Sequence, residues 1–309
     1  MAIKNQLKKG EPLKLQSVVV VLVGQPDSGK TSLACTAERV LFFDVDDGLT
    51  RAVGDVIPDE PVQPKSLQDF FDLDANDFKE YKTIVIDTIG KFIRLIELHI
   101  NTETPQLAKD GRKYHPEIKR LFDQFNMKMK SLGVDVVYTA QVNETEKGDV
   151  AKIDIDMGSK KGRSELIQDA HLIGYVDFKD KKKRRLCFDA DGFVIGKNSP
   201  NIPEQIVDVE KNPKQLADII AQVKEMVVIK NRIRAEKKEI FEDRLQKIEN
   251  MLDLEKVNFY LQDTEMMADI AIKSKFAQKA KELGFIYNKE TKLFENSITQ
   301  ESEKEDEHK

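Results

Sequence analysis

The feature that most constrains the fold of this 309-residue chain is a glycine-containing segment that directly follows a run of six apolar residues. The segment, residues 24–32, reads GQPDSGKTS and matches the pattern G-x-x-x-x-G-K-[ST] at every fixed position, and the apolar run is residues 18–23. A loop between a buried strand and a helix directs several backbone N–H groups at one anion. We therefore expect a strand, a phosphate-binding loop and a helix over residues 18–38.

This pattern also predicts a bound nucleotide, because its lysine reaches the outer phosphates and its hydroxyl residue reaches Mg²⁺. Lys30 and Thr31 take these two roles. An ordinary glycine turn is the alternative interpretation. The candidate nucleotide contacts are Gly24, Gln25, Pro26, Asp27, Ser28, Gly29, Lys30, Thr31 and Ser32.

Strand-like and helix-like patterns alternate along the first two thirds of the chain. Apolar runs occur at residues 40–45, 83–86, 135–140 and 171–178, and apolar spacings of three and four predict helices at 91–100 and 116–132. Such alternation is typical of an α/β fold with a mainly parallel sheet. Two late runs, at 174–178 and 185–188, predict an antiparallel hairpin around a Lys-rich turn.

The composition divides the chain into four parts. We expect a basic N-terminal arm (1–16), the α/β core (17–223), a charged, smaller α-helical C-terminal region (224–295) and an acidic, disordered tail (296–309). The helical region is predicted to be a small bundle or an oligomerisation arm. Its sequence predicts no catalytic or ligand-binding residues.

Charge and cysteine content limit the possible classes of protein. The net charge of −5 argues against a protein that coats nucleic acid with its whole surface, although basic residues concentrate within 147–185. The longest apolar stretch is too short to span a bilayer, and the N-terminal segment has no secretory apolar core, so a cytoplasmic protein is expected. Cys35 and Cys187 are too few for a disulfide framework or a metal cluster and are predicted to be buried apolar residues.

Carboxylates follow two of the predicted strands. Asp87 ends the run 84–86 and is the candidate partner of Thr31 in holding hydrated Mg²⁺, the alternative being an Asp that caps the next helix. Asp44, Asp46 and Asp47 follow the run 41–43. We expect Asp46 to orient an attacking water, a choice that rests mostly on the family resemblance described next, and we expect Asp44 and Asp47 to be structural.

The ordered set of these segments, together with residues 136–141 (VVYTAQ), resembles the RecA-like P-loop ATPases. Within them it is most similar to the phage single-strand annealing ATPases grouped with AAA-type domains. The resemblance covers residues 18–223 and implies binding of ATP and Mg²⁺. It maps Asp46 onto the family's glutamate, with a side chain one methylene shorter, which should affect the hydrolysis rate rather than nucleotide binding. It also implies that Gln141 senses the γ-phosphate and that Lys197 reaches a neighbouring subunit's ATP.

The segment that follows Gln141, residues 143–168, is polar, cationic and contains several glycines, which suits contact with a phosphate backbone. We expect a flexible loop here, and in RecA-like proteins the matching loop contacts single-stranded DNA. A solvated loop without a ligand is the alternative. The candidate DNA contacts are Lys147, Lys152, Lys160, Lys161 and Arg163.

The leading functional hypothesis is an ATPase that binds single-stranded DNA. It would promote annealing or strand exchange, as in phage recombination, and assemble as a homo-oligomeric ring or filament with ATP sites between subunits. The alternative is a nucleotide-gated adaptor such as a helicase loader in phage replication, with the C-terminal region binding a replication partner or a single-strand-binding protein. A metabolic kinase is a weaker third hypothesis, because no acceptor pocket can be recognised in the sequence.

Overall fold

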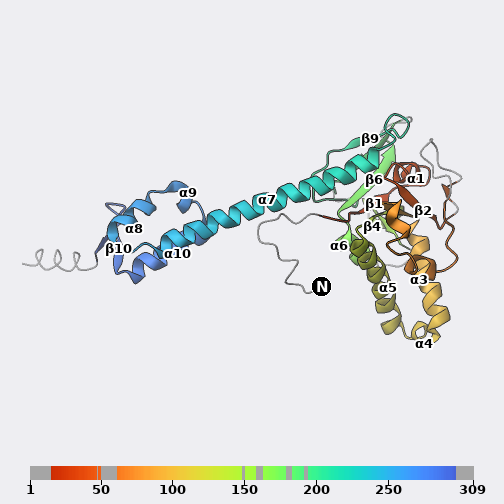
Figure 1. Cartoon of the computed structure of the whole chain (residues 1–309), viewed down its shortest axis with the longest axis horizontal. Coiled ribbons are helices and arrows are strands. Elements are labelled where there is room, and N and C mark those ends of the chain that lie inside the picture. Colours follow the sequence, from red (N-terminus) through yellow and green to blue (C-terminus); the bar gives the residue numbers. More distant parts are fainter. Residues whose placement is uncertain are drawn as a thin grey trace, which may run out of the picture. The chain divides into compact units, whose positions relative to one another are not determined.

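The computed structural model describes residues 15–46, 48–49, 61–147, 150–157, 163–178, 183–190 and 194–296 (Figure 1). The chain divides between Ile229 and Lys230 into two compact units. The first contains the phosphate-binding loop and the second is the C-terminal unit. No helix in the described ranges combines the length and the apolar character needed to cross a membrane.

A nine-stranded sheet forms the centre of the first unit. Its main path runs in the order β2-β3-β4-β1-β6-β7-β9, with β5 paired to β4 and β8 paired to β6. The strands β2, β3, β4, β1 and β6 are parallel to one another. Strands β7 and β8 each pair antiparallel with β6, and β9 pairs antiparallel with β7. The strands are β1 (Val19–Val23), β2 (Val40–Asp44), β3 (Thr83–Asp87), β4 (Asp135–Lys147), β5 (Val150–Asp156), β6 (Leu172–Phe178), β7 (Arg184–Cys187), β8 (Lys197–Asn198) and β9 (Gln205–Val207).

Helices cover both faces of this sheet. On one face, α3 (Ile89–Glu103) and α5 (Gly111–Leu132) lie side by side and pack a cluster of phenylalanines onto the strands (Figure 1). On the other face, α1 (Lys30–Ala34) and the beginning of α7 (Gln215–Glu249) pack on the alternate side chains of the same strands. Because β1 is buried on both faces, it consists entirely of valine and leucine. The predicted α/β core with a mainly parallel sheet is confirmed.

Shorter helices connect these elements. They are α2 (Gln68–Phe71), the 3₁₀ helix η3 (Asp77–Lys79), α4 (Pro105–Ala108) and α6 (Arg163–Asp169). The helix after the phosphate-binding loop ends at Ala34, earlier than the predicted residue 38. The late hairpin is present as the antiparallel pair β6–β7.

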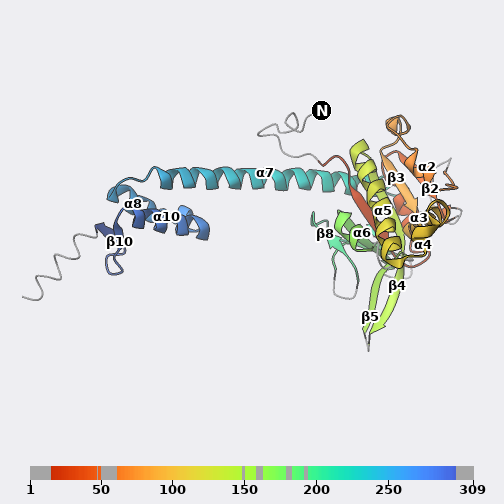
Figure 2. The ribbon, with the colours of Figure 1, turned by 90° about the horizontal axis from the view of Figure 1, so that it is seen from below.

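The predicted flexible loop after Gln141 is wrong over much of its length. Strand β4 continues to Lys147 and pairs antiparallel with β5, from Gln141 opposite Asp156 to Lys147 opposite Val150. This hairpin extends away from the rest of the sheet (Figure 2). Ile153 and Ile155 alternate with charged residues in β5, and β-branched residues at alternate positions favour a strand over a loop.

The second unit has its own hydrophobic core. It contains the end of α7 with α8 (Leu254–Leu261), α9 (Thr264–Met267), α10 (Ile270–Glu282) and the antiparallel pair β10 (Phe285–Tyr287) and β11 (Phe294–Asn296). The predicted α-helical C-terminal region is confirmed, although the final hairpin was not predicted. Helix α7 begins before the predicted boundary at residue 224, and the arm 1–14 and residues 297–309 of the tail lie outside the described residues.

Candidate nucleotide-binding site

The loop between β1 and α1 has a conformation that requires both of its fixed glycines. A Cβ on Gly24 would lie 2.4 Å from the carbonyl oxygen of Val176, and the Gly24 N–H donates to the carbonyl of Ala140 at 3.2 Å. Gly29, which precedes α1, has φ +96°, a value that side-chain-bearing residues rarely adopt. The motif therefore forms a tight loop against the ends of two strands.

Lys30 is held within this loop. Its Nζ donates to the carbonyls of Gly24 and Gln25 at 2.9 and 2.7 Å and to the Ser28 hydroxyl at 3.3 Å. Burial lowers the pKa of the Lys30 ammonium from its usual 10.5 to about 8, although the nearby charges of Asp87 and Asp27 oppose the shift. A negative ligand beside this ammonium would favour its charged form.

Asp87, at the end of β3, lies beside the loop. The Thr31 hydroxyl donates to one of its carboxylate oxygens at 2.6 Å, and the hydroxyl of Thr139 in β4 donates to the other. Burial raises the pKa of the Asp87 carboxyl above its usual value, while these two hydrogen bonds oppose the rise. Sequence reasoning did not find Thr139, although a lone polar residue in the apolar run 136–140 was a usable signal.

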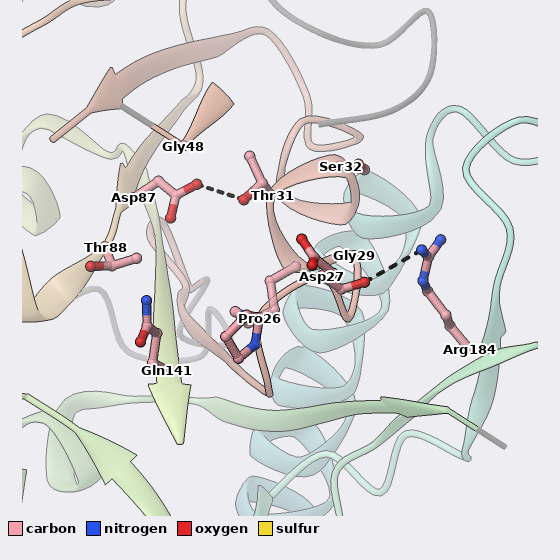
Figure 3. A pocket seen from close by; sticks show the side chains of 11 residues that line it. Pro26, Asp27, Gly29, Thr31, Ser32, Gly48, Asp87, Thr88, Gln141 and Arg184 are labelled. Atoms are coloured by element: carbon pink, nitrogen blue, oxygen red, sulfur yellow. Dashed lines mark hydrogen bonds between the residues drawn. The ribbon is translucent and has the colours of Figure 1, made fainter. Parts of the chain in front are cut away.

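A pocket of about 310 Å³ joins these groups (Figure 3). It brings together eight of the predicted site residues: the nucleotide-contact candidates Pro26, Asp27, Gly29, Lys30, Thr31 and Ser32, together with Asp87 and Gln141. Gln141 points into it from β4, beside Asp87 and Thr88 (Figure 3). The lining residues are Pro26, Asp27, Gly29, Lys30, Thr31, Ser32, Gly48, Asp87, Thr88, Gln141 and Arg184.

The Thr31 hydroxyl and the Asp87 carboxylate fit magnesium better than a transition metal. Mg²⁺ is commonly held by one or two protein oxygens together with substrate phosphates and water. Over the described ranges, no group of three His, Cys, Asp or Glu side chains could hold a metal ion. A metal here would therefore depend on phosphate oxygens for part of its coordination.

Two predicted catalytic residues do not line this pocket. Asp46 forms an ion pair with Lys91 at 3.3 Å and lines a separate pocket of about 360 Å³. Lys197 donates from Nζ to the carbonyls of Ile167 and Gln168, at 2.7 and 3.0 Å, in the last turn of α6. Within this chain, Lys197 thus stabilises a helix end.

Of the two other aspartates at the end of β2, Asp44 and Asp47, only Asp44 lies among the described residues. Asp44 is buried and accepts the backbone N–H groups of Gly48 and Leu49, at 2.8 and 3.3 Å, which agrees with the structural role expected for it. Asp47 lies outside the described residues. Cys35 is buried as predicted, whereas Cys187 is half-buried.

The candidate DNA contacts lie on and after the β4–β5 hairpin. Lys147 ends β4, Lys152 lies in β5 and Arg163 begins α6. Lys160 and Lys161 lie outside the described residues. Gln141 forms the first residue pair of the hairpin, so the pocket and the hairpin meet at this residue.

A family model described as an AAA domain matches residues 16–232, which is more than half of the chain. The chain belongs to this AAA domain family. The matched range includes every strand of the central sheet and the beginning of α7. No curated protein matches the sequence significantly. Among solved structures, this chain is similar to the KaiC-like protein PH0186 from Pyrococcus horikoshii OT3, with 13% identity and a TM-score of 0.34, over 66% of this chain and 96% of that one.

Proposed function

We propose that this AAA domain binds Mg-ATP and hydrolyses it. The observation that carries the proposal is the hydrogen bond between Thr31 and Asp87 in the pocket that Lys30 and Gln141 also line. In P-loop proteins a hydroxyl and a carboxylate in this relation hold the metal, and the lysine contacts the outer phosphates. The bound Mg²⁺ would neutralise charge on the phosphates.

The chain's own residues would divide the remaining work. Lys30 would exchange the loop carbonyls for phosphate oxygens, and Gln141 would contact the γ-phosphate. Asp46 is proposed to orient the attacking water, which requires its release from Lys91 because the two now form an ion pair outside the pocket. Asp46→Asn should lower turnover while nucleotide affinity stays constant, and Asp46→Glu should raise turnover, since it restores the longer acid that the resemblance implies. Equal turnover in all three proteins would remove Asp46 from the mechanism.

We further propose that the AAA domain acts on single-stranded DNA as an annealing or recombination ATPase. Support comes from the position of Gln141, which lines the pocket and also begins the hairpin that carries Lys147 and Lys152. A nucleotide contact at Gln141 would therefore reach the segment that is proposed to contact DNA. Phage recombination remains the context implied by the resemblance.

The first test is ATP turnover with and without single-stranded oligonucleotide. Wild-type protein should be stimulated by DNA, and Lys30→Ala should bind no nucleotide, whereas Lys91→Ala, which removes a charge outside the pocket, should still bind it. No binding of Mg-ATP by wild-type protein would refute the proposal. Binding and turnover without any response to DNA would refute the DNA role alone.

The DNA contacts have their own signature in the salt dependence of binding. Each phosphate contact to a single strand contributes about −0.7 to the slope of log affinity against log salt concentration. Replacing all five candidate cations by alanine should therefore flatten the slope by up to about 3.5. A control that removes Lys273, Lys275 and Lys281, which are exposed on α10, should leave it unchanged. The five candidates are Lys147, Lys152, Lys160, Lys161 and Arg163.

Assembly into a ring or filament with shared ATP sites is also proposed. Lys197 would have to leave the carbonyls at the end of α6 to reach a neighbouring site. Mixing Lys197→Ala with Lys30→Ala should restore activity, because some interfaces would then combine an intact Lys30 with an intact Lys197. Strictly additive loss would confine Lys197 to its role in stabilising α6.

A nucleotide-gated adaptor is the second candidate function. The C-terminal unit folds around its own core and leaves the large apolar side chains of Leu252, Phe259 and Ile270 from 69% to 85% exposed. Contiguous apolar patches mark protein interaction sites, and we propose that these three side chains belong to one such patch. Replacing the three residues by serine should abolish partner capture and spare ATP turnover if the adaptor hypothesis holds. Loss of DNA stimulation in the same variant would favour a DNA-binding role for this unit.

A further inference from the structure

Arg184 approaches the phosphate-binding loop from a part of the sequence that the motif does not include. It begins β7, where it pairs with Phe178 of β6 and Val207 of β9. Its side chain extends to the loop: a Cβ built on Gly29 would lie 3.0 Å from Cδ and 3.2 Å from Nε of Arg184. Its Nη2 donates to the carbonyl of Asp27 at 3.4 Å (Figure 3). The missing side chain at Gly29 therefore makes room for the arginine.

The positive charge of Arg184 has no counter-ion among the described residues, and its buried Nε donor has no hydrogen-bond partner there. The Nε of its neighbour Arg185 also has no hydrogen-bond partner, but the charge of Arg185 is paired, because its guanidinium lies 3.5 Å from Asp177 and 3.6 Å from Glu204. Leaving a buried guanidinium N–H without an acceptor is unfavourable, so such a group in a binding pocket favours an anionic ligand.

The orientation of Arg184 is fixed by its surroundings. The guanidinium carbon lies 5.6 Å from the ring centroid of Phe178, a cation–π contact. With Cδ against Gly29 and one nitrogen on Asp27, the guanidinium is held at the pocket wall. A cation positioned in advance loses less conformational entropy when it binds a ligand.

The side of the loop on which Arg184 lies indicates which phosphates it can reach. Asp87, Thr88 and Gln141 line the opposite flank of the pocket, with the loop between them and Arg184 (Figure 3). Thr31 and Asp87 mark the flank of the metal and the outer phosphates, whereas the loop's backbone N–H groups hold the α- and β-phosphates. Arg184 packs on the loop itself, at Gly29, rather than on the metal flank.

We propose that Arg184 is a second phosphate-binding cation of this site, which holds the α- and β-phosphates of nucleoside di- and triphosphates alike. The inference rests on the proposed nucleotide binding and adds a residue from the β6–β7 hairpin to it. Because the contact is the same in the ground and transition states, it lowers KM without raising kcat.

The test compares Mg-ADP with a non-hydrolysable Mg-ATP analogue by titration calorimetry. Arg184→Gln should weaken both by the same factor, about ten- to a hundredfold, because hydrogen bonds to charged groups contribute about 1.5–3 kcal/mol. Steady-state turnover of ATP should show a raised KM and an unchanged kcat. Arg184→Lys keeps the charge but not the planar fork, so it should weaken both nucleotides equally and to a smaller extent.

Arg185→Gln is the matched control, because it removes the same charge from the next residue of β7, which is paired to Asp177 and Glu204 instead of the loop. It should bind both nucleotides as wild type does. Thermal unfolding without nucleotide shows whether each variant is folded. If Arg184→Gln does not fold, the affinities of Arg184→Lys for the two nucleotides test the inference instead.

The outcomes separate this inference from the proposed function. Wild-type protein that binds neither nucleotide refutes the proposed function. Wild-type protein that binds both, with Arg184 variants of unchanged affinity, refutes the role of Arg184 alone. Weakening confined to the triphosphate analogue would also overturn the inference, since Arg184 would then contact the γ-phosphate.

Discussion

Lys30 couples nucleotide binding to proton uptake, and the size of the effect follows from its burial. In the described structure its pKa is lowered to about 8, since burial disfavours the charged ammonium. A phosphate group favours the charged ammonium, so binding should raise the pKa of Lys30. The direction follows from linkage: affinity is fully present below pH 8 and is lost as the pH rises above 8, where the lysine must first take up a proton.

The magnitude can be worked out from this pKa. At pH 8.5 a lysine with a pKa of about 8 is protonated in about one quarter of the molecules, so binding should take up about 0.8 proton. At pH 6.5 the uptake from Lys30 should be about 0.03 proton. Between pH 7 and pH 9.5 the affinity should fall about thirtyfold. The nucleotide phosphates contribute little at the alkaline end, because the pKa of such a phosphate group lies near 6.

The assay is titration calorimetry with Mg-ADP at pH 8.5, in buffers that differ in ionisation enthalpy. The slope of the measured heat against that enthalpy gives the number of protons exchanged. Lys91→Met, which removes a lysine outside the pocket, should show the same uptake as wild type. Wild-type protein that binds nucleotide at pH 8.5 without taking up protons would refute the reasoning, because Lys30 would then be charged before the ligand arrives.

Three further outcomes are expected. Thr139→Val should lower the free energy of unfolding by about 1.5–3 kcal/mol at neutral pH, measured by urea denaturation, and Thr139→Ser should not, because only valine removes the hydrogen bond to Asp87. This loss should shrink as the pH falls toward 3.8, since a carboxyl with a raised pKa is protonated there in the native state. Gly29→Ala should lower the free energy of unfolding by about 1–3 kcal/mol, because Gly29 has a positive φ, and should also weaken nucleotide binding. Gly133 has a positive φ as well but open space around it, so Gly133→Ala should lower the free energy of unfolding without changing nucleotide binding. With the other cysteine changed to serine, Cys35 should react with iodoacetamide at pH 8 only on unfolding, because burial raises its pKa to about 12.

Local sequence patterns were sufficient to predict the central sheet and the loop. The central strands are buried on both faces, so each forms a continuous apolar run that is recognisable without tertiary information. The loop motif combines two glycines of special geometry with Lys30 and Thr31 within nine residues. These predictions depend only on neighbours in the sequence.

The residues that sequence reasoning missed depend on strand pairing. Thr139 reaches Asp87 because β3 and β4 are adjacent and parallel, with Ile86 opposite Tyr138. Arg184 reaches Gly29 because β6 pairs with both β1 and β7, which places β7 near the loop. Neither register can be derived from spacing along the chain, since residues 184 and 29 are far apart in sequence.

The predicted domain boundary shows a second limit of prediction from sequence. It was placed where the composition becomes charged, but α7 begins at Gln215, and Leu216, Ile219 and Val223 pack on the sheet at helical spacing. Lys224 then forms a 2.7 Å ion pair with the buried Asp135. A charged residue at the predicted boundary thus belongs to the first unit, because its ion-pair partner is buried there.

The position of β4 suggests how the pocket and the hairpin could be coupled. Strand β4 pairs with β3 as far as Tyr138 and with β1 as far as Ala140. From Gln141 onward its only strand partner in the described structure is β5. Gln141 is therefore the residue at which the pairing of β4 with the central parallel strands gives way to pairing with β5. Since Thr139 and Gln141 are two residues apart, they lie on the same side of β4, one at the buried Asp87 and the other at the pocket. A contact that displaces Gln141 would meet less resistance on the hairpin side than on the sheet side, so the hairpin is the segment that nucleotide would move.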